Sequence, residues 1–137
     1  MPFSFINTVA SWMLKKRIHE IELFIKYPVD VQNEQLKKLL NTAKNTKFGK
    51  KYEFSSIDDY KTFSERVPSF TYEEFFPIIN KTIKGEQNIF WPEKIKWFAQ
   101  SSGTTNSKSK FLPVSNSSLD NCHFKGGKDM LCFYLIM

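Results

Sequence analysis

Cysteine, glycine and proline are all scarce in this 137-residue chain, and each shortage excludes a class of protein. The chain has 2 Cys, 5 Gly and 6 Pro. So little Gly and Pro excludes collagen-like chains and low-complexity linkers. Cys122 and Cys132 lie in one predicted helix, about 15 Å apart by helical rise, which is too far for a disulfide. We therefore expect reduced thiols and a cytoplasmic protein.

Long apolar runs and a Walker A glycine motif are also missing. The N-terminal stretch 1–17 is interrupted by Ser4, Asn7 and Thr8, and its charges follow the apolar residues instead of preceding them. This order is unlike a signal peptide, and the stretch is too short and polar to span a bilayer. No G-x-x-x-x-G-K-[ST] run occurs in the sequence. We expect a packed amphipathic helix here and no stable membrane insertion.

Apolar and basic residues are present in quantity. Hydrophobic residues make up 41% of the chain and aromatic residues 16%, which suffices to bury a core in one domain. The net charge of +6 favours anionic partners, which include nucleotides, nucleic acids and acidic membrane surfaces. Most lysines are scattered, as on a solvated surface. The final run LCFYLIM is apolar and uncapped, so we expect a fragment of a longer protein.

Helical spacing of apolar residues predicts two helices at the start of the chain. The first spans Phe5–Lys26 and ends before Pro28, because the residue that precedes a proline is pushed away from helical angles. The second is predicted to begin with Asp30 as its N-cap. Thr46–Tyr52 is predicted to be a loop.

Two capping patterns predict the next helices. Ser56–Asp59 resembles a capping box with Asp in place of Glu, and it is expected to open a short helix. Thr71–Glu74 is a complete capping box. Pro77 is expected to kink or divide the helix that follows, and Gly85 to close it.

The pattern changes after residue 94. Ile95–Gln100 (IKWFAQ) and Lys110–Val114 (KFLPV) are short, rich in β-branched and aromatic residues, and bounded by turn residues, which predicts two strands. Pro113 favours a position near the end or on an edge. Ser115 or Asn116 is then expected to cap a last helix.

The segment between these strands, Ser101–Lys110 (SSGTTNSKSK), carries the groups that polyphosphate binding requires. It offers many hydroxyls, Gly103 permits positive φ angles, and Lys108 and Lys110 supply charge. The same composition is typical of an exposed linker, and composition alone favours that interpretation. The flanking strands favour a site, because a flexible linker rarely joins two strands that pair with each other.

A strand followed by [ST]-[ST]-G-[ST]-[ST], a loop and a lysine resembles the first signature of adenylate-forming enzymes. Most members place the lysine one position earlier than this chain, in which Lys110 falls seven residues after Gly103. The longer loop, with Leu112-Pro113 behind it, resembles the auxin-responsive, Gretchen-Hagen-type family of acyl acid–amido synthetases. The chain is most similar to the bacterial members, and the resemblance extends over Phe54–Tyr60, Phe63–Pro68, Thr71–Pro77, Gly85–Pro92 and Ile95–Phe98.

The resemblance implies an α/β fold. Residues 1–94 would form a helical leader, and residues 95–137 the first strand–loop–strand–helix of the large domain of an adenylate-forming enzyme, so that 1–137 is the N-terminal part of that domain. Three positions differ from the plant pattern: Asn106 and Ser107 stand where glycines are usual, and Lys108 stands where an acidic residue is common.

The resemblance also implies a ligase activity. A small carboxylic acid would react with ATP, assisted by Mg²⁺, to give an acyl-adenylate, and an amine or amino acid would then form an amide. The phosphate-binding residues would be Ser101, Ser102, Gly103, Thr104, Thr105 and Lys110. The family's later motifs are absent from these residues, so we expect no catalytic residue, no protein metal site and no activity from this fragment alone.

Two other functions are open at this point. A small basic module could contact nucleic acid or a membrane, although the sequence shows neither a sequence-reading helix nor an RNA-binding aromatic signature, and we expect no nucleic-acid partner. An inactive truncated copy is the other. Cys122-His123 is a weak metal candidate, because adjacent helical residues point in different directions. The oligomeric state and the acyl and amine substrates stay open.

Overall fold

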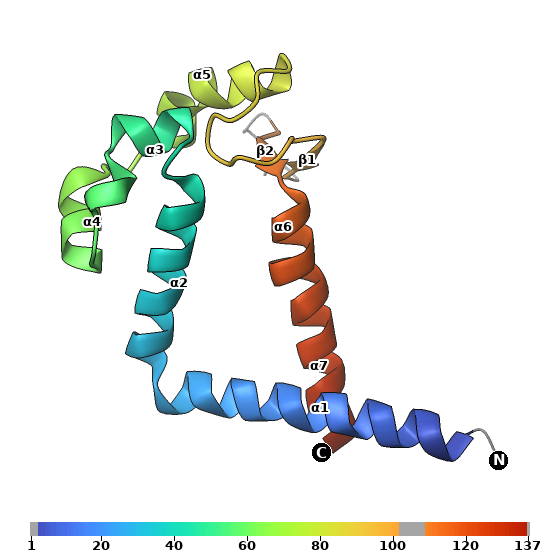
Figure 1. Cartoon of the computed structure of the whole chain (residues 1–137). Coiled ribbons are helices and arrows are strands. Elements are labelled where there is room, and N and C mark those ends of the chain that lie inside the picture. The colour runs from blue at the N-terminus through green and yellow to red at the C-terminus, as the bar shows by residue number, and fades with distance from the viewer. Residues whose placement is uncertain (1–2, 102–108, 137) are drawn as a thin grey trace.

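The computed structural model describes residues 3–101 and 109–136, which are mostly helical with one small sheet. Figure 1 shows α1 along one side, with α2 and the α6–α7 column rising from it toward α3, α5 and the strands. The elements in chain order are α1 (Phe3–Lys26), α2 (Pro28–Ala43), α3 (Lys47–Lys51), a 3₁₀-helix (Phe54–Ser56), α4 (Tyr60–Arg66), α5 (Tyr72–Ile83), β1 (Trp97–Gln100), β2 (Phe111–Val114), α6 (Asn116–Ser118), a π-helix (Leu119–Phe124) and α7 (Lys125–Ile136).

Pro28 separates the first two helices, as predicted, but the predicted N-cap of α2 is wrong. The N-cap is Tyr27, Pro28 takes the first helical position, and Asp30 lies in the first turn. Proline suits that position because its φ is already helical and the missing N–H has no intrahelical partner there. Asp30 still stabilises the helix start through its negative charge.

The predicted loop Thr46–Tyr52 is wrong, because it contains helix α3. The buried Thr46 caps this helix, and its hydroxyl accepts a hydrogen bond from the Gly49 N–H at 2.9 Å. The free N–H groups of Lys47 and Phe48 donate to carbonyls of residues 88 and 89 at 3.0 and 2.9 Å. These partners from a distant loop satisfy the donors of a helix too short to be stable alone.

The start predicted for α4 at Ser56 is also wrong. Ser56 ends the 3₁₀-helix, and α4 begins at Tyr60 behind Asp59, whose carboxylate accepts from the Thr62 N–H at 2.7 Å. That hydrogen bond from the Thr62 backbone lowers the pKa of Asp59. A carboxylate is a strong N-cap acceptor, so Asp59 takes the place that the sequence pattern assigned to Ser56.

The capping box of α5 is confirmed. The Thr71 hydroxyl accepts from the Glu74 N–H at 3.3 Å, and the Glu74 carboxylate accepts from the Thr71 N–H at 2.8 Å. Gly85 follows the helix with φ of +97°, as expected for its closing residue. Helix α5 is continuous through Pro77, which lies inside it, so the predicted division is wrong; the missing N–H of a proline deprives only the carbonyl four residues earlier of its helical partner.

Aromatic side chains gather around Phe48 at the junction of α3, α5 and the loop before β1. The Phe48 ring lies 4.6–6.4 Å, centroid to centroid, from five other rings. Ile79 of α5 is fully buried, with 1% of its surface exposed. We call this cluster the aromatic platform; its rings belong to Phe48, Tyr52, Phe54, Phe70, Phe75 and Phe90.

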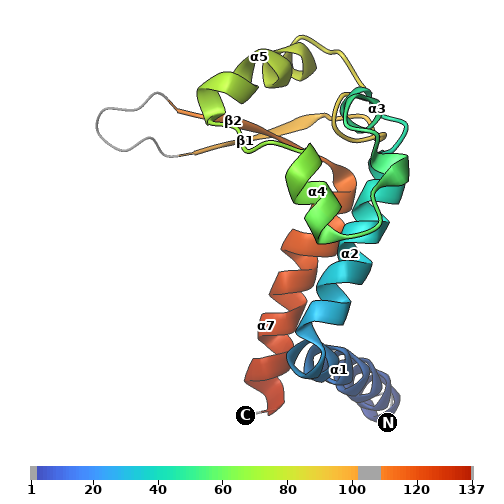
Figure 2. The same cartoon turned by 90° about the vertical axis from the view of Figure 1, so that its left-hand side faces the viewer.

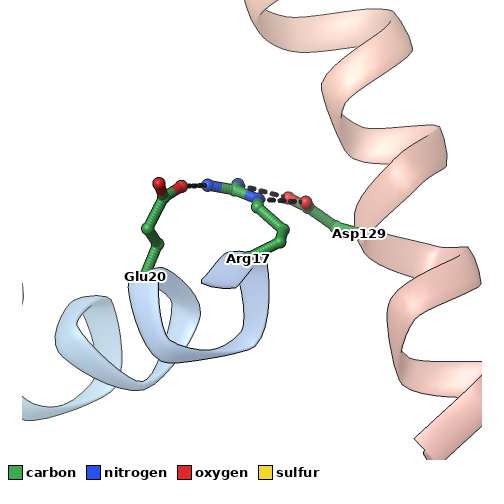
Figure 3. A network of polar contacts seen from close by, with 3 residues as sticks. All are labelled: Arg17, Glu20 and Asp129. Atoms are coloured by element: carbon green, nitrogen blue, oxygen red, sulfur yellow. Dashed lines mark hydrogen bonds and ion pairs between the residues drawn. The ribbon is translucent and has the colours of Figure 1, made fainter. Parts of the chain in front are cut away.

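A polar contact joins α1 to α7 at the other end of the molecule (Figure 3). The Arg17 guanidinium donates from Nε and Nη2 to the Asp129 carboxylate at 2.5 and 2.7 Å, and from Nη1 to Glu20 at 2.6 Å. The Arg17 side chain is only 14% exposed. The hydrogen bond from Arg17 lowers the pKa of Asp129. We call this contact the α1–α7 joint.

The two predicted strands form an antiparallel hairpin in which Trp97 pairs with Val114 and Gln100 with Phe111. Both begin later than predicted, because Ile95, Lys96 and Lys110 lie outside them. Figure 2 shows the hairpin extending beneath α5, and α5 packs against β2. After β2, the Ser115 hydroxyl accepts from the Ser118 N–H at 3.0 Å and caps α6, as expected.

Candidate phosphate-binding hairpin

The hairpin brings the first and last of the predicted site residues face to face. The Ser101 N–H donates to the Lys110 carbonyl at 3.0 Å. In return, the Lys110 N–H donates to the Ser101 hydroxyl oxygen at 3.2 Å. The side chain of Ser101 therefore continues the ladder of hydrogen bonds by one residue and holds together the two ends of the predicted loop. Its hydroxyl proton is still available to a ligand, because a hydroxyl can accept and donate at once.

The central site residues lie outside the described part of the chain. Ser102, Gly103, Thr104 and Thr105 fall within 102–108. The structure therefore describes the neck of the predicted loop, and the assignment of these four residues to phosphate binding stays a prediction.

Lys110 is half-buried at the neck, with its ammonium group over an aromatic ring. Its Nζ lies 5.2 Å from the centroid of the Tyr72 ring. The Tyr72 hydroxyl accepts from the Phe111 N–H at 2.9 Å. From the sequence, the segment around Tyr72 predicts only a helix start and contributes to the family resemblance. No local pattern could have identified the contact, because its partners are 39 residues apart in the sequence.

The end of the hairpin away from the loop is also anchored. Glu93, in the segment before β1, accepts from the Ser117 N–H at 3.0 Å and also from the Ser117 hydroxyl. The start of the helix after β2 is thereby tied to the segment before β1. Together with the Ser101–Lys110 bonds, this contact holds both ends of the hairpin.

The described residues give no support to a metal site at Cys122-His123 or to a membrane-spanning helix. Cys122 is exposed, whereas Cys132 is buried, and both are free thiols. Within residues 3–101 and 109–136, no three His, Cys, Asp or Glu side chains come together as metal ligands. Of the described helices, none is long and apolar enough to cross a membrane.

The family model described as "GH3 family N-terminal domain" matches residues 17–135. That match covers nearly all of the chain, including the hairpin and both partners of the α1–α7 joint, Arg17 and Asp129. The chain belongs to the GH3 family. This finding confirms the family resemblance drawn from the loop and its flanking segments.

Curated GH3 relatives are similar over most of the chain. An indole-3-acetic acid-amido synthetase of Arabidopsis thaliana is 32% identical over 106 residues, which are 77% of this chain and 19% of that protein. A jasmonoyl–L-amino acid synthetase of Nicotiana attenuata is 30% identical over 108 residues, 78% of this chain and 19% of that protein. This GH3 chain thus spans about a fifth of the length of the curated relatives it matches.

Proposed function

We propose that this chain is the nucleotide-phosphate-binding part of an ATP-dependent acyl acid–amido synthetase. In that reaction a substrate carboxylate attacks the α-phosphorus of ATP. An acyl–oxygen–phosphorus bond forms, the bond to the β-phosphate breaks, and pyrophosphate leaves. An amine then attacks the acyl carbon and releases AMP. The related proteins are named indole-3-acetic acid-amido synthetase and jasmonoyl–L-amino acid synthetase; for this chain the acid and the amine stay unspecified.

The single observation that supports this role is the closed neck between Ser101 and Lys110. Two strands in register fix both ends of a segment rich in hydroxyl groups, so that binding a ligand need not first bring those ends together. Lys110 would place its positive charge on the β- and γ-phosphates and so stabilise the charge that develops on pyrophosphate. Ser101 to Thr105 would supply backbone and hydroxyl donors to the same oxygens.

We assign Mg²⁺ to none of the described side chains, because no cluster of acidic or histidine ligands occurs among residues 3–101 and 109–136. The chain would contribute phosphate binding, with residues 1–94 as the helical leader of the large domain and 95–137 as its first strand–loop–strand–helix unit. We propose a cytoplasmic location, consistent with the free thiols of Cys122 and Cys132.

The proposal is tested by calorimetric titration of the 137-residue chain with ATP and with inorganic tripolyphosphate. Lys110→Gln should weaken both affinities by about tenfold to a hundredfold, since a hydrogen bond from a charged group contributes roughly 1.5–3 kcal/mol. Lys37→Gln, on the exposed part of α2, removes the same charge elsewhere and should leave both affinities unchanged. Equal losses in the two variants would show that only net charge matters and would contradict the site.

A second titration, with nonspecific duplex DNA, distinguishes the proposed phosphate site from the alternative of a small basic module that contacts nucleic acid. If DNA binds more tightly than ATP, with steep salt dependence and no loss in Lys110→Gln, the chain is a general anion-binding surface.

The reaction itself is tested in a protein that contains this chain together with the remaining length of the family. There, carboxylate-dependent exchange of pyrophosphate into ATP should fall in Gly103→Val and Lys110→Gln. Unchanged exchange in both would refute the loop assignment.

A further inference from the structure

The Tyr72 ring contacts the one described lysine at the neck of the hairpin. Lys110 Nζ lies 5.2 Å from the centroid of that ring. The face of a tyrosine ring is electron-rich and attracts a cation within about 6 Å. A lysine side chain otherwise samples many rotamers, and ordering them opposes binding. The ring therefore restricts the ammonium group before any ligand arrives.

The hydroxyl of the same Tyr72 is bound to the strand that carries the lysine. It accepts from the Phe111 N–H at 2.9 Å and donates to the Phe111 carbonyl at 3.3 Å. The N–H and carbonyl of Lys110 are directed toward Ser101, so those of the next residue point to the outer edge of β2. The tyrosine hydroxyl satisfies both groups there, as a third strand would.

Tyr72 is itself held by the start of α5. It is the first residue of that helix, directly behind the Thr71–Glu74 capping box. Its ring lies 5.6 Å, centroid to centroid, from Phe76, one turn further along the helix. The capping box thus positions the Tyr72 ring at the start of α5. The ring in turn restrains the Lys110 ammonium group, and the Tyr72 hydroxyl binds the start of β2 at Phe111.

We infer that Tyr72 is a positioning residue that holds the Lys110 ammonium group ready for a polyphosphate; this inference rests on the proposed function. An ammonium group has three N–H donors. The ring face occupies one side of it, and the other donors remain for phosphate oxygens. Tyr72 need not touch the phosphates, and its contribution to their binding passes through Lys110.

The contact itself is measured without a ligand. In proton NMR of the free chain, the terminal methylene groups of Lys110 should be shifted upfield by the ring current of Tyr72. Tyr72→Phe should keep this shift because it keeps the ring, and Tyr72→Leu should abolish it. A Lys110 resonance at its ordinary position in the unmodified chain would overturn the inference and leave the proposed function untouched.

The positioning role is measured by a double-mutant cycle with inorganic tripolyphosphate. Tyr72→Leu should weaken binding by about two- to fivefold, the usual size of an exposed cation–π contact. In the Lys110→Gln background the same substitution should have no further effect. Tyr60→Leu is the matched control, because Tyr60 is likewise the first residue of a capped helix but is 68% exposed; it should change nothing.

The outcomes separate the inference from the proposed function. If Lys110→Gln weakens binding and Tyr72→Leu does not, the inference fails and the proposed function stands. An equal loss from Tyr72→Leu in both backgrounds would assign Tyr72 a purely structural role and overturn the inference. Tighter binding in Tyr72→Leu would mean that the Tyr72 ring competes with the phosphates for the Lys110 ammonium group, and this result would also overturn the inference. If Lys110→Gln itself has no effect, the proposed function fails.

Discussion

The aromatic platform and the α1–α7 joint are built from different interactions. The platform packs six aromatic rings together, and one of them, Phe75, lies on α5 one turn before the buried Ile79. The joint relies on the guanidinium of Arg17 between two carboxylates. Around it the helices expose large apolar side chains, among them Trp12 at 63%, Met130 at 68% and Tyr134 at 80%. Helix α5 contributes Phe75 to the platform, and Tyr72 is the first residue of the same helix.

This difference indicates where the stability of the chain lies. Burial of apolar surface stabilises a fold in proportion to the area removed from water, whereas a partly exposed ion pair loses much of its attraction to desolvation and solvent screening. We therefore expect amide protons of α5 to exchange with solvent more slowly than those of α1. The hairpin that holds the candidate site packs against α5, and so it contacts the region that we expect to be the more stable.

The largest effect is expected from Ile79→Ala on α5, the helix that contributes Phe75 to the platform. The substitution removes buried methylene groups and leaves a cavity, which should lower the free energy of unfolding by about 3 kcal/mol. Ile25→Ala is the matched control, because Ile25 is 75% exposed on α1, and it should change stability by less than about 0.5 kcal/mol. Urea unfolding followed by circular dichroism measures both. Similar losses in the two variants would contradict the distinction between the regions.

A smaller loss is expected from Arg17→Met at the joint. Asp129 would keep its half-buried carboxylate without a partner, at a cost of about 1–2 kcal/mol. Lys15→Met removes a nearby exposed charge on the same helix and should be neutral. Restoring an uncharged pair with Arg17→Met and Asp129→Leu together should recover most of the loss. A double variant that is less stable than Arg17→Met alone would show that the ion pair is not the reason for the effect.

The joint should also make stability depend on pH. The pKa of Asp129 lies below its ordinary value near 3.8, chiefly because Arg17 donates hydrogen bonds to its carboxylate. A lowered folded-state pKa adds stability above the ordinary value, and that stability disappears as the pH falls through the folded-state value. The difference in unfolding free energy between the unmodified chain and Asp129→Asn should therefore shrink as the pH falls from 5 toward 2. A constant difference would exclude the linkage.

The smallest effect is expected at the link between the platform and the site. Thr71→Ala removes the cap of α5 and should cost about 1 kcal/mol. Because Tyr72 follows directly, the substitution should also shift the amide resonance of Phe111, which donates to the Tyr72 hydroxyl. Thr42→Ala, an exposed position within α2, should leave that resonance in place. An unchanged Phe111 amide resonance in Thr71→Ala would show that the helix cap does not affect the position of the hairpin.

Local patterns were sufficient for several parts of the fold. The Thr71–Glu74 box, the break at Pro28 and the pair of strands were predicted, because the interacting groups lie within a few residues or alternate along a short strand. The starts of α2 and α4 were misplaced because several residues nearby can cap a helix. For Asp59, only the formed backbone shows that its carboxylate reaches the Thr62 N–H.

The sequence by itself determined the order of the longer helices and the two strands, the family resemblance and the position of the candidate loop. Tertiary structure decided what surrounds them. Helix α3 exists because residues 88 and 89 accept from its first N–H groups, Tyr72 meets Lys110 and Phe111 from another element, and Arg17 finds Asp129 across 112 residues. Contacts over such separations leave no periodicity or spacing in the sequence, because they depend on how complete elements pack against one another.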